Sequence, residues 1–228
     1  MNMKKYLIIF LIFIVLSISG CSKVDPPIFG DEYYVRFKLY GKDVFLEIPY
    51  GYFYNASMKG KDWRFVNKKL PPSNAFTLQI IPDFINKKFI IFNKESANEY
   101  YKLSSISSLI YLESVDGYNI NFKKYESRLS RDLKYYCGSE YSCYLNKDKS
   151  EGFSGYTLIK DSKDSGFIIT MSNEGEFNGM SIINYSLKTK YLSVRFSLRL
   201  NGYFIEENYA VSFAKEMIKI VNGFIKDE

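Results

Sequence analysis

Leu192-Ser-Val-Arg-Phe-Ser-Leu-Arg-Leu200 is the stretch of this chain from which the fold is most readily inferred. Apolar side chains alternate with serine and arginine, which predicts a strand with one buried and one solvated face. Downstream, apolar residues recur every three or four positions, and this spacing predicts an amphipathic helix over residues 212–225 with Ser212 as its N-cap. Its apolar stripe comprises Ala214, Met217, Ile218, Val221, Phe224 and Ile225. We therefore expect an α+β fold, in which antiparallel sheets built from hairpins pack against the C-terminal helix.

Earlier segments show the same alternation of apolar and polar residues between turn residues. We expect one hairpin over residues 33–48 and another around the turn cluster 161–166. The two-residue Asp116-Gly117 link between two alternating segments predicts a third hairpin, because both residue types tolerate a positive φ. The other expected strands cover residues 76–81, 88–92, 109–115, 118–122, 156–160, 167–172, 180–187 and 203–205.

Two further features of the sequence are a short periodic segment and an internal similarity. Tyr125, Leu129 and Leu133 recur every four residues, which predicts a short helix over 124–134. Residues 35–48 also resemble residues 194–207, and each segment starts with the spacing of a hairpin. Internal duplication and convergent strand chemistry both account for this similarity.

Composition and charge exclude several classes of function. The chain has 228 residues, a net charge of +6 with no run of five like charges, and no histidine. A scattered positive charge does not predict a nucleic-acid partner. Without histidine there is no Ser-His-Asp or Cys-His catalysis and no histidine metal site, so we expect a non-enzyme with no cofactor and no metal.

The N-terminus carries the pattern of an export signal. Lys4 and Lys5 precede an apolar run over residues 7–16, which is too short to span a bilayer as a helix. The sequence Ile18-Ser-Gly-Cys21 then resembles the lipobox of bacterial lipoproteins. This resemblance implies a signal peptide over 1–20 and a lipid on Cys21 as the mature N-terminus. It also implies a membrane-anchored protein of the cell envelope that faces the periplasm.

Domain organisation follows from that cleavage site. We expect a lipidated tether over 21–31, stiffened by Pro26-Pro27, and one α+β globular domain over 32–228. Ser22 at the second mature position, in place of aspartate, indicates the outer membrane if the cell is Gram-negative.

The two remaining cysteines, Cys137 and Cys143, are an even pair in an exported protein and predict a disulfide. A redox-active pair and a thiolate metal site are the alternatives, although the spacing is not C-x-x-C. Tyr135, Tyr136, Tyr141 and Tyr144 lie in or beside this small ring. Tyrosines on a pre-organised loop are typical of a partner-binding surface, and a simple staple across a loop is the alternative.

Three short patterns resemble catalytic or metal-binding motifs, and each lacks a feature that its motif requires. Ser212-Phe-Ala-Lys215 matches S-x-x-K, but the companion motifs of penicillin-recognising enzymes are missing. Gly152-Phe-Ser-Gly155 lacks the spacing of a nucleophile elbow. Residues 161–166 lack the ligand pattern of a calcium loop and read instead as a turn.

Taken with the lipobox, the aromatic-rich strands and the terminal helix look like the periplasmic immunity lipoproteins that protect bacteria against type VI secretion effectors. This resemblance implies a protein that binds a secreted toxic effector and neutralises it by surface contact. A structural or assembly lipoprotein of the envelope is the alternative, and an envelope hydrolase that uses carboxylates is a third hypothesis.

Overall fold

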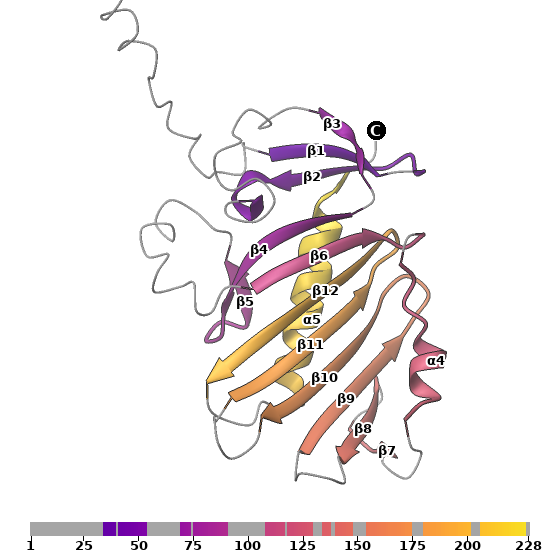
Figure 1. Ribbon diagram of the computed structural model, residues 1–228, viewed down its shortest axis with the longest axis vertical. Coiled ribbons are helices and arrows are strands. Elements are labelled where there is room, and N and C mark those ends of the chain that lie inside the picture. Colours follow the sequence, from indigo (N-terminus) through magenta and orange to yellow (C-terminus); the bar gives the residue numbers. More distant parts are fainter. Residues whose placement is uncertain are drawn as a thin grey trace, which may run out of the picture.

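The main body of the protein is a nine-stranded antiparallel sheet with the order β5-β4-β6-β12-β11-β10-β9-β8-β7 (Figure 1). The computed structural model describes residues 34–39, 41–53, 69–73, 75–90, 108–116, 118–129, 134–137, 140–147, 154–174, 180–201 and 206–226. The strands are β4 (Ala75–Asp83), β5 (Lys88–Ile90), β6 (Ser108–Ser114), β7 (Lys134–Tyr135), β8 (Ser142–Lys147), β9 (Ser154–Asp161), β10 (Gly166–Glu174), β11 (Met180–Lys188) and β12 (Leu192–Asn201).

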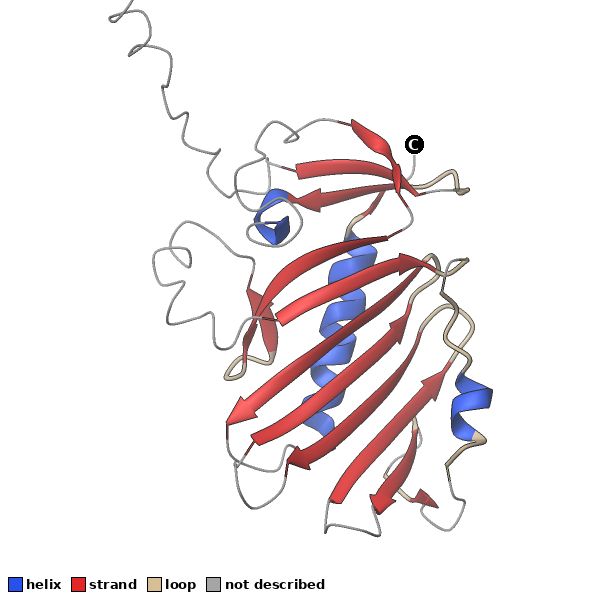
Figure 2. Ribbon diagram, in the orientation of Figure 1, coloured by secondary structure: helices blue, strands red, loops and turns tan. Residues whose placement is uncertain are grey.

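A second sheet of four strands has the order β13-β2-β1-β3 and lies beyond β4 (Figure 2). Its β1–β2 hairpin is the one predicted over 33–48, while β1 and β3 pair in parallel. The elements are β1 (Tyr34–Leu39), β2 (Phe45–Pro49), the 3₁₀-helix η1 (Tyr50–Phe53), β3 (Lys69–Ser73) and β13 (Ile225–Lys226). The α+β class and the antiparallel hairpins are confirmed, with this one parallel pair as an addition.

The C-terminal helix α5 (Glu207–Gly223) lies across one face of the large sheet (Figure 1). Met217 and Val221 are fully buried, which confirms the predicted stripe. The predicted start at Ser212 is wrong, because the apolar face extends back to Ala210 and Val211 and the helix starts after Glu206. The Ser212 hydroxyl caps nothing and instead donates to the carbonyl oxygen of Asn208 at 2.7 Å, within the helix.

The last two residues of the predicted stripe lie beyond the helix. Phe224 is buried and forms the C-cap, and Ile225 opens β13, which pairs with Leu46 of β2. The end of α5 is therefore attached to the small sheet.

One cluster of buried side chains includes residues of both sheets and of α5. Phe37 of β1 stacks on Phe76 of β4, and Tyr52 of η1 meets Phe224 edge to face, with ring centroids 5.3 Å apart in each pair. The two sheets and α5 thus share one hydrophobic core among the described residues.

The hairpin predicted around Asp116-Gly117 is wrong. Both edges of β6 are occupied, by β4 on one side and β12 on the other, so no edge is left for residues 118–122. Asn121 instead caps the helix α4 (Phe122–Glu126), since its Oδ1 accepts the backbone N–H of Lys124 at 2.8 Å. Asparagine favours this position because its short side chain reaches the first free N–H groups.

The helix predicted over 124–134 is shorter in the structure, because α4 begins earlier, at Phe122, and ends at Glu126. Tyr125 and Leu129 do face inward, against a small cluster formed by Ile120, Phe122, Tyr144, Ile159 and Ile168. Leu133 lies outside the described residues. Thus α4 covers the β9 end of the sheet on the face opposite α5.

The two hairpins of the second half, β9–β10 and β11–β12, form as alternation predicts, and the 161–166 cluster closes the first. The similarity between 35–48 and 194–207 does not extend to sheet position. The strand β1 lies in the small sheet, β12 lies between β6 and β11, and α5 begins at Glu207. The strand expected at 203–205 lies outside the described residues.

Candidate functional site

The Cys137–Cys143 ring lies between β7 and β8 at the edge of the large sheet. The two cysteines are at disulfide distance, with Cα atoms 6.1 Å apart, as the sequence predicts. Across the ladder, Tyr135 pairs with Cys143, and the side chain of Tyr135 lies outside what the structure describes. The ring therefore closes the outermost hairpin of the sheet.

The ring is attached to α5 by polar contacts. Glu140 accepts from the Lys215 ammonium at 2.9 Å and lies 3.7 Å from Lys160. The hydrogen bond from Lys215 and its charge lower the pKa of the Glu140 carboxyl, and Lys160 adds to this. Tyr141 donates to Asn208 Oδ1 at 3.4 Å and packs against Phe167. Burial, followed by the nearby Glu207 charge, raises the pKa of Tyr141.

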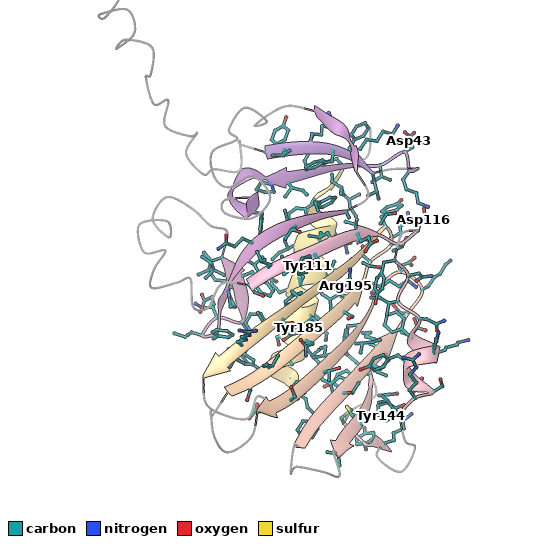
Figure 3. The ribbon with its side chains drawn as sticks, viewed as in Figure 1. Asp43, Tyr111, Asp116, Tyr144, Tyr185 and Arg195 are labelled. Carbon is teal, nitrogen blue, oxygen red and sulfur yellow. A yellow bond between two sulfur atoms is a disulfide. The ribbon has the colours of Figure 1, made fainter. Side chains whose placement is uncertain are left out.

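The tyrosines predicted to form one binding surface therefore have different environments. Tyr136 is 88% exposed, and Tyr141 is half-buried. Tyr144 is a core residue that is only 4% exposed, and its hydroxyl donates to the Glu126 carboxylate of α4 (Figure 3). Burial and this hydrogen bond raise the pKa of Tyr144 to about 12. Of these three side chains, only Tyr136 projects freely from the ring.

Sequence reasoning missed a second surface, the face of the large sheet that looks away from α5. Along β12 the even-numbered residues from Leu192 to Leu198 are buried, so Arg195, Ser197 and Arg199 point to this other face. On β6 the same face carries Leu109 and Tyr111, which are 43% and 49% exposed. The alternation of 109–115 already indicated that Tyr111 would lie opposite the buried Ile110 and Leu112.

Arg195 is at the centre of this face (Figure 3). It pairs across the ladder with Tyr111, and its guanidinium lies 3.3 Å from the Glu113 carboxylate. Its guanidinium carbon also lies 4.4 Å from the ring centroid of Tyr118. The Tyr118 segment is held in turn by Ser193, whose hydroxyl donates to the Tyr118 carbonyl at 2.6 Å. These contacts hold the Arg195 guanidinium and the Tyr118 segment in place before any partner binds.

We call this surface the open face and define it by Leu109, Tyr111, Tyr118, Arg195 and Arg199. The outward side chains described on β6, β11 and β12 include the bases Lys188, Arg195 and Arg199 against one acid, Glu113. In Figure 1 this face is turned to the viewer, with α5 behind the sheet and α4 to one side. The open face is basic and carries exposed aromatic rings.

The candidate catalytic and metal groups do not assemble into a reactive site in the described part of the chain. Ser212 is bonded to its own helix and Lys215 to Glu140, so the S-x-x-K pair makes no contact that activates the serine. The 161–166 segment, considered above as a calcium loop, is a turn that Ser162 and Ser165 close through a backbone hydrogen bond of 3.1 Å. Of the pattern compared with a nucleophile elbow, residues 152 and 153 lie outside the described ranges.

Within the described ranges, one group of three metal-ligating side chains lies together: Cys137, Cys143 and Glu207. In a disulfide the two sulfurs are not thiolate ligands, so with the ring oxidised this group offers only the Glu207 carboxylate of α5.

No described helix is both long and apolar enough to cross a membrane. Cys21 and the signal segment lie outside the described residues. Comparison of the chain with protein-family models, with curated proteins and with solved structures gave no match.

Proposed function

We propose that this protein is a periplasm-facing lipoprotein, anchored through Cys21, that binds and neutralises a protein partner and performs no catalysis. The partner that we propose is a secreted toxic effector, so that the chain acts as an immunity protein. The anchor is inferred from the Ile18-Ser-Gly-Cys21 sequence, and the binding role from the open face.

The open face is the observation that carries the proposal. Tyrosine and arginine are the residue types that contribute most often to binding hot spots, because each offers a large contact area and polar groups together. Here Tyr111 and Arg195 are cross-strand neighbours on the sheet, and the Arg195 guanidinium is held between the Glu113 carboxylate and the Tyr118 ring. Little side-chain freedom is lost on binding when the groups are ordered beforehand.

The excess of basic residues on the open face indicates what surface its partner should have. Three outward bases against one acid would repel a second copy of the same face, so a symmetric dimer through this surface is unfavourable. A protein whose surface combines carboxylates with apolar groups would complement it, and the charges would speed its encounter with the anchored chain. The anchor adds to this effect by raising the local concentration of the chain at the membrane.

The absence of histidine from the whole sequence also favours binding over catalysis, since it removes the commonest general base at neutral pH. Among the described residues, the serine–lysine pair is bonded elsewhere. A neutralising protein needs only a complementary surface.

The test is a strain that lacks the gene, challenged by sister cells with an active secretion system. We expect the deletion strain to be killed, the wild-type gene to restore survival, and the effector to co-purify with the tagged protein. Survival of the deletion strain without any co-purified effector would contradict the immunity role and favour a structural or assembly lipoprotein.

A double variant of the open face and a point variant of the disulfide hairpin then distinguish the two surfaces. We expect Tyr111→Ala combined with Arg199→Glu to abolish protection, because these changes remove an exposed ring and reverse a charge on the open face. Tyr136→Ala removes a ring that is even more exposed, 88% against 49% for Tyr111, from the disulfide hairpin and should leave protection intact. The opposite result would assign binding to the ring, as the sequence first indicated.

A further inference from the structure

The turn between β4 and β5, residues 84–87, presents an aliphatic side chain to solvent. Ile85 is 90% exposed, whereas its neighbour Phe84 turns inward and meets Phe213 of α5 edge to face at 5.8 Å. A single exposed aliphatic residue is common on protein surfaces. Whether Ile85 has a function therefore depends on how the turn is held and on what surrounds it.

The turn is held rigidly. Asp83 Oδ1 accepts the backbone N–H groups of Ile85 at 3.2 Å and of Asn86 at 3.0 Å, and Asp83 Oδ2 accepts from the Asn86 side chain at 2.7 Å. From α5, the Tyr209 hydroxyl donates to the carbonyl oxygen of Phe84. Lys87 has a φ of 54° and its ammonium lies 5.4 Å from the Tyr209 ring centroid. Ile85 is thus fixed at the apex, so that little conformational entropy opposes its burial by a partner.

Positive charge flanks the apex. Lys87 and Lys88 are both exposed, and Asp83 is the single acid between residues 83 and 90. The Asp83 oxygens are directed at the hydrogen bonds of the turn itself. An apolar apex with lysines beside it combines the two interactions that hold proteins on anionic membranes, namely interfacial burial and attraction to the headgroups.

The turn lies on the same side of the view in Figure 1 as the start of β1, although below it along the long axis. The chain from Cys21 to Tyr34 can extend at most about 47 Å. A lipid on Cys21 would therefore keep the domain close to the bilayer, where even a weak second contact is populated.

We propose that the β4–β5 turn docks on the anionic lipid surface, with Ile85 in the interface and Lys87 and Lys88 at the lipid phosphates. This inference rests on the proposed anchoring at Cys21. It is independent of the open face and of the effector. The contact would orient the domain on its tether.

The two lysines and Ile85 are expected to contribute to the strength of docking by different amounts. Each lysine close to an anionic surface strengthens the contact about fivefold, so neutralising both should weaken docking roughly 25-fold. Replacing Ile85 by a polar residue should weaken it about tenfold or more.

The experiment uses the full-length lipidated protein in phosphatidylcholine vesicles, with and without phosphatidylglycerol, in which some acyl chains are brominated. Ile85→Trp places an indole at the apex, and Tyr136→Trp is the matched control at an equally exposed site on the disulfide hairpin. The unsubstituted protein, with Trp63 alone, gives the background. Circular dichroism and the melting midpoint confirm that each variant is folded.

We expect the bromine atoms to quench the Ile85→Trp indole in anionic vesicles, with a blue-shifted emission, and to leave the Tyr136→Trp indole unquenched. Adding Lys87→Gln and Lys88→Gln, or omitting phosphatidylglycerol, should abolish most of the quenching. Equal quenching at both sites, quenching that ignores the lysines, or a shift that occurs only when a protein partner is added would each overturn the proposal.

Flotation of the vesicles tests the anchor at Cys21 separately from docking of the β4–β5 turn. Protein that floats with an unquenched Ile85→Trp indole would overturn docking of the turn and leave the anchor standing. Wild-type protein that does not float would overturn the anchor, and with it the docking that depends on it.

Discussion

Replacing Tyr185 by phenylalanine should stabilise this protein, although it removes a polar group from a fully buried core residue. Tyr185 lies on β11 beneath α5, and its ring stacks on Phe196 with centroids 4.3 Å apart. Burial, with a smaller effect of Tyr209, raises its pKa well above the usual value of tyrosine. Its hydroxyl has no hydrogen-bond partner among the described residues.

A buried hydroxyl without a partner costs about 1–3 kcal/mol, because it loses its bonds to water and gains none. The change Tyr185→Phe removes that cost and keeps the ring contacts. We therefore expect an increase of about 1 kcal/mol in the free energy of unfolding. For a domain of this length, that increase raises the melting midpoint by about 2–4 °C.

Tyr144→Phe is the matched control, because it deletes the same atom from another buried tyrosine. The Tyr144 hydroxyl donates to the carboxylate of Glu126, and hydrogen bonds to charged groups contribute about 1.5–3 kcal/mol. Glu126 is half-exposed and can regain water, so we expect a loss at the lower end of that range. The assay is urea and thermal unfolding followed by circular dichroism. Equal destabilisation by both variants would refute the reasoning, since it would show that the Tyr185 hydroxyl is bonded.

Radiolabelled palmitate should enter the wild type and not the Cys21→Ser variant; equal labelling would exclude lipidation there. The exported protein should contain no free thiol, and Cys137→Ser with Cys143→Ser should cost about 2 kcal/mol, measured by urea unfolding. Met217→Asp should cost about 3–5 kcal/mol because it buries a carboxylate beneath α5; an unchanged midpoint would place this position in solvent. Since folding raises the pKa of Tyr144 from 10 to about 12, its share of the stability is present below pH 10 and lost between pH 10 and 12. Tyr144→Phe should therefore flatten that alkaline loss in a pH series.

The parts of the fold that were predictable from sequence are those set by local contacts. In β9–β10 and β11–β12, each strand pairs with its neighbour along the chain, so alternation and turn residues suffice to give the strands and their partners. The stripe of α5 was likewise visible, because one continuous segment carries the whole pattern. Its start was misplaced because Ser212 resembles an N-cap, while packing of Ala210 and Val211 extends the helix.

The wrong predictions concern features that depend on contacts between segments distant in sequence. Asp116-Gly117 is a good hairpin link, but β6 already has β4 and β12 at its two edges, and those strands are distant in sequence. The same limit applies to the sites. Tyr111 and Arg195 are cross-strand neighbours separated by more than eighty residues, and nothing local indicates that they meet. Tyr144 was read as a surface residue because no periodicity shows that α4 covers it.

The composition of the open face argues for a non-obligate partner, one that binds after this protein has folded on its own. In the described part of the chain, α5 covers one face of the nine-stranded sheet and α4 covers only the β9 end of the other. Serine, asparagine and arginine between the rings keep the remaining surface soluble, as Ser197 and Asn184 illustrate by bonding to each other at 2.6 Å. Such a mixture is typical of non-obligate interfaces, whereas permanent ones resemble a protein core. An immunity protein has to remain folded and soluble until its effector arrives, and a surface of this kind meets that requirement.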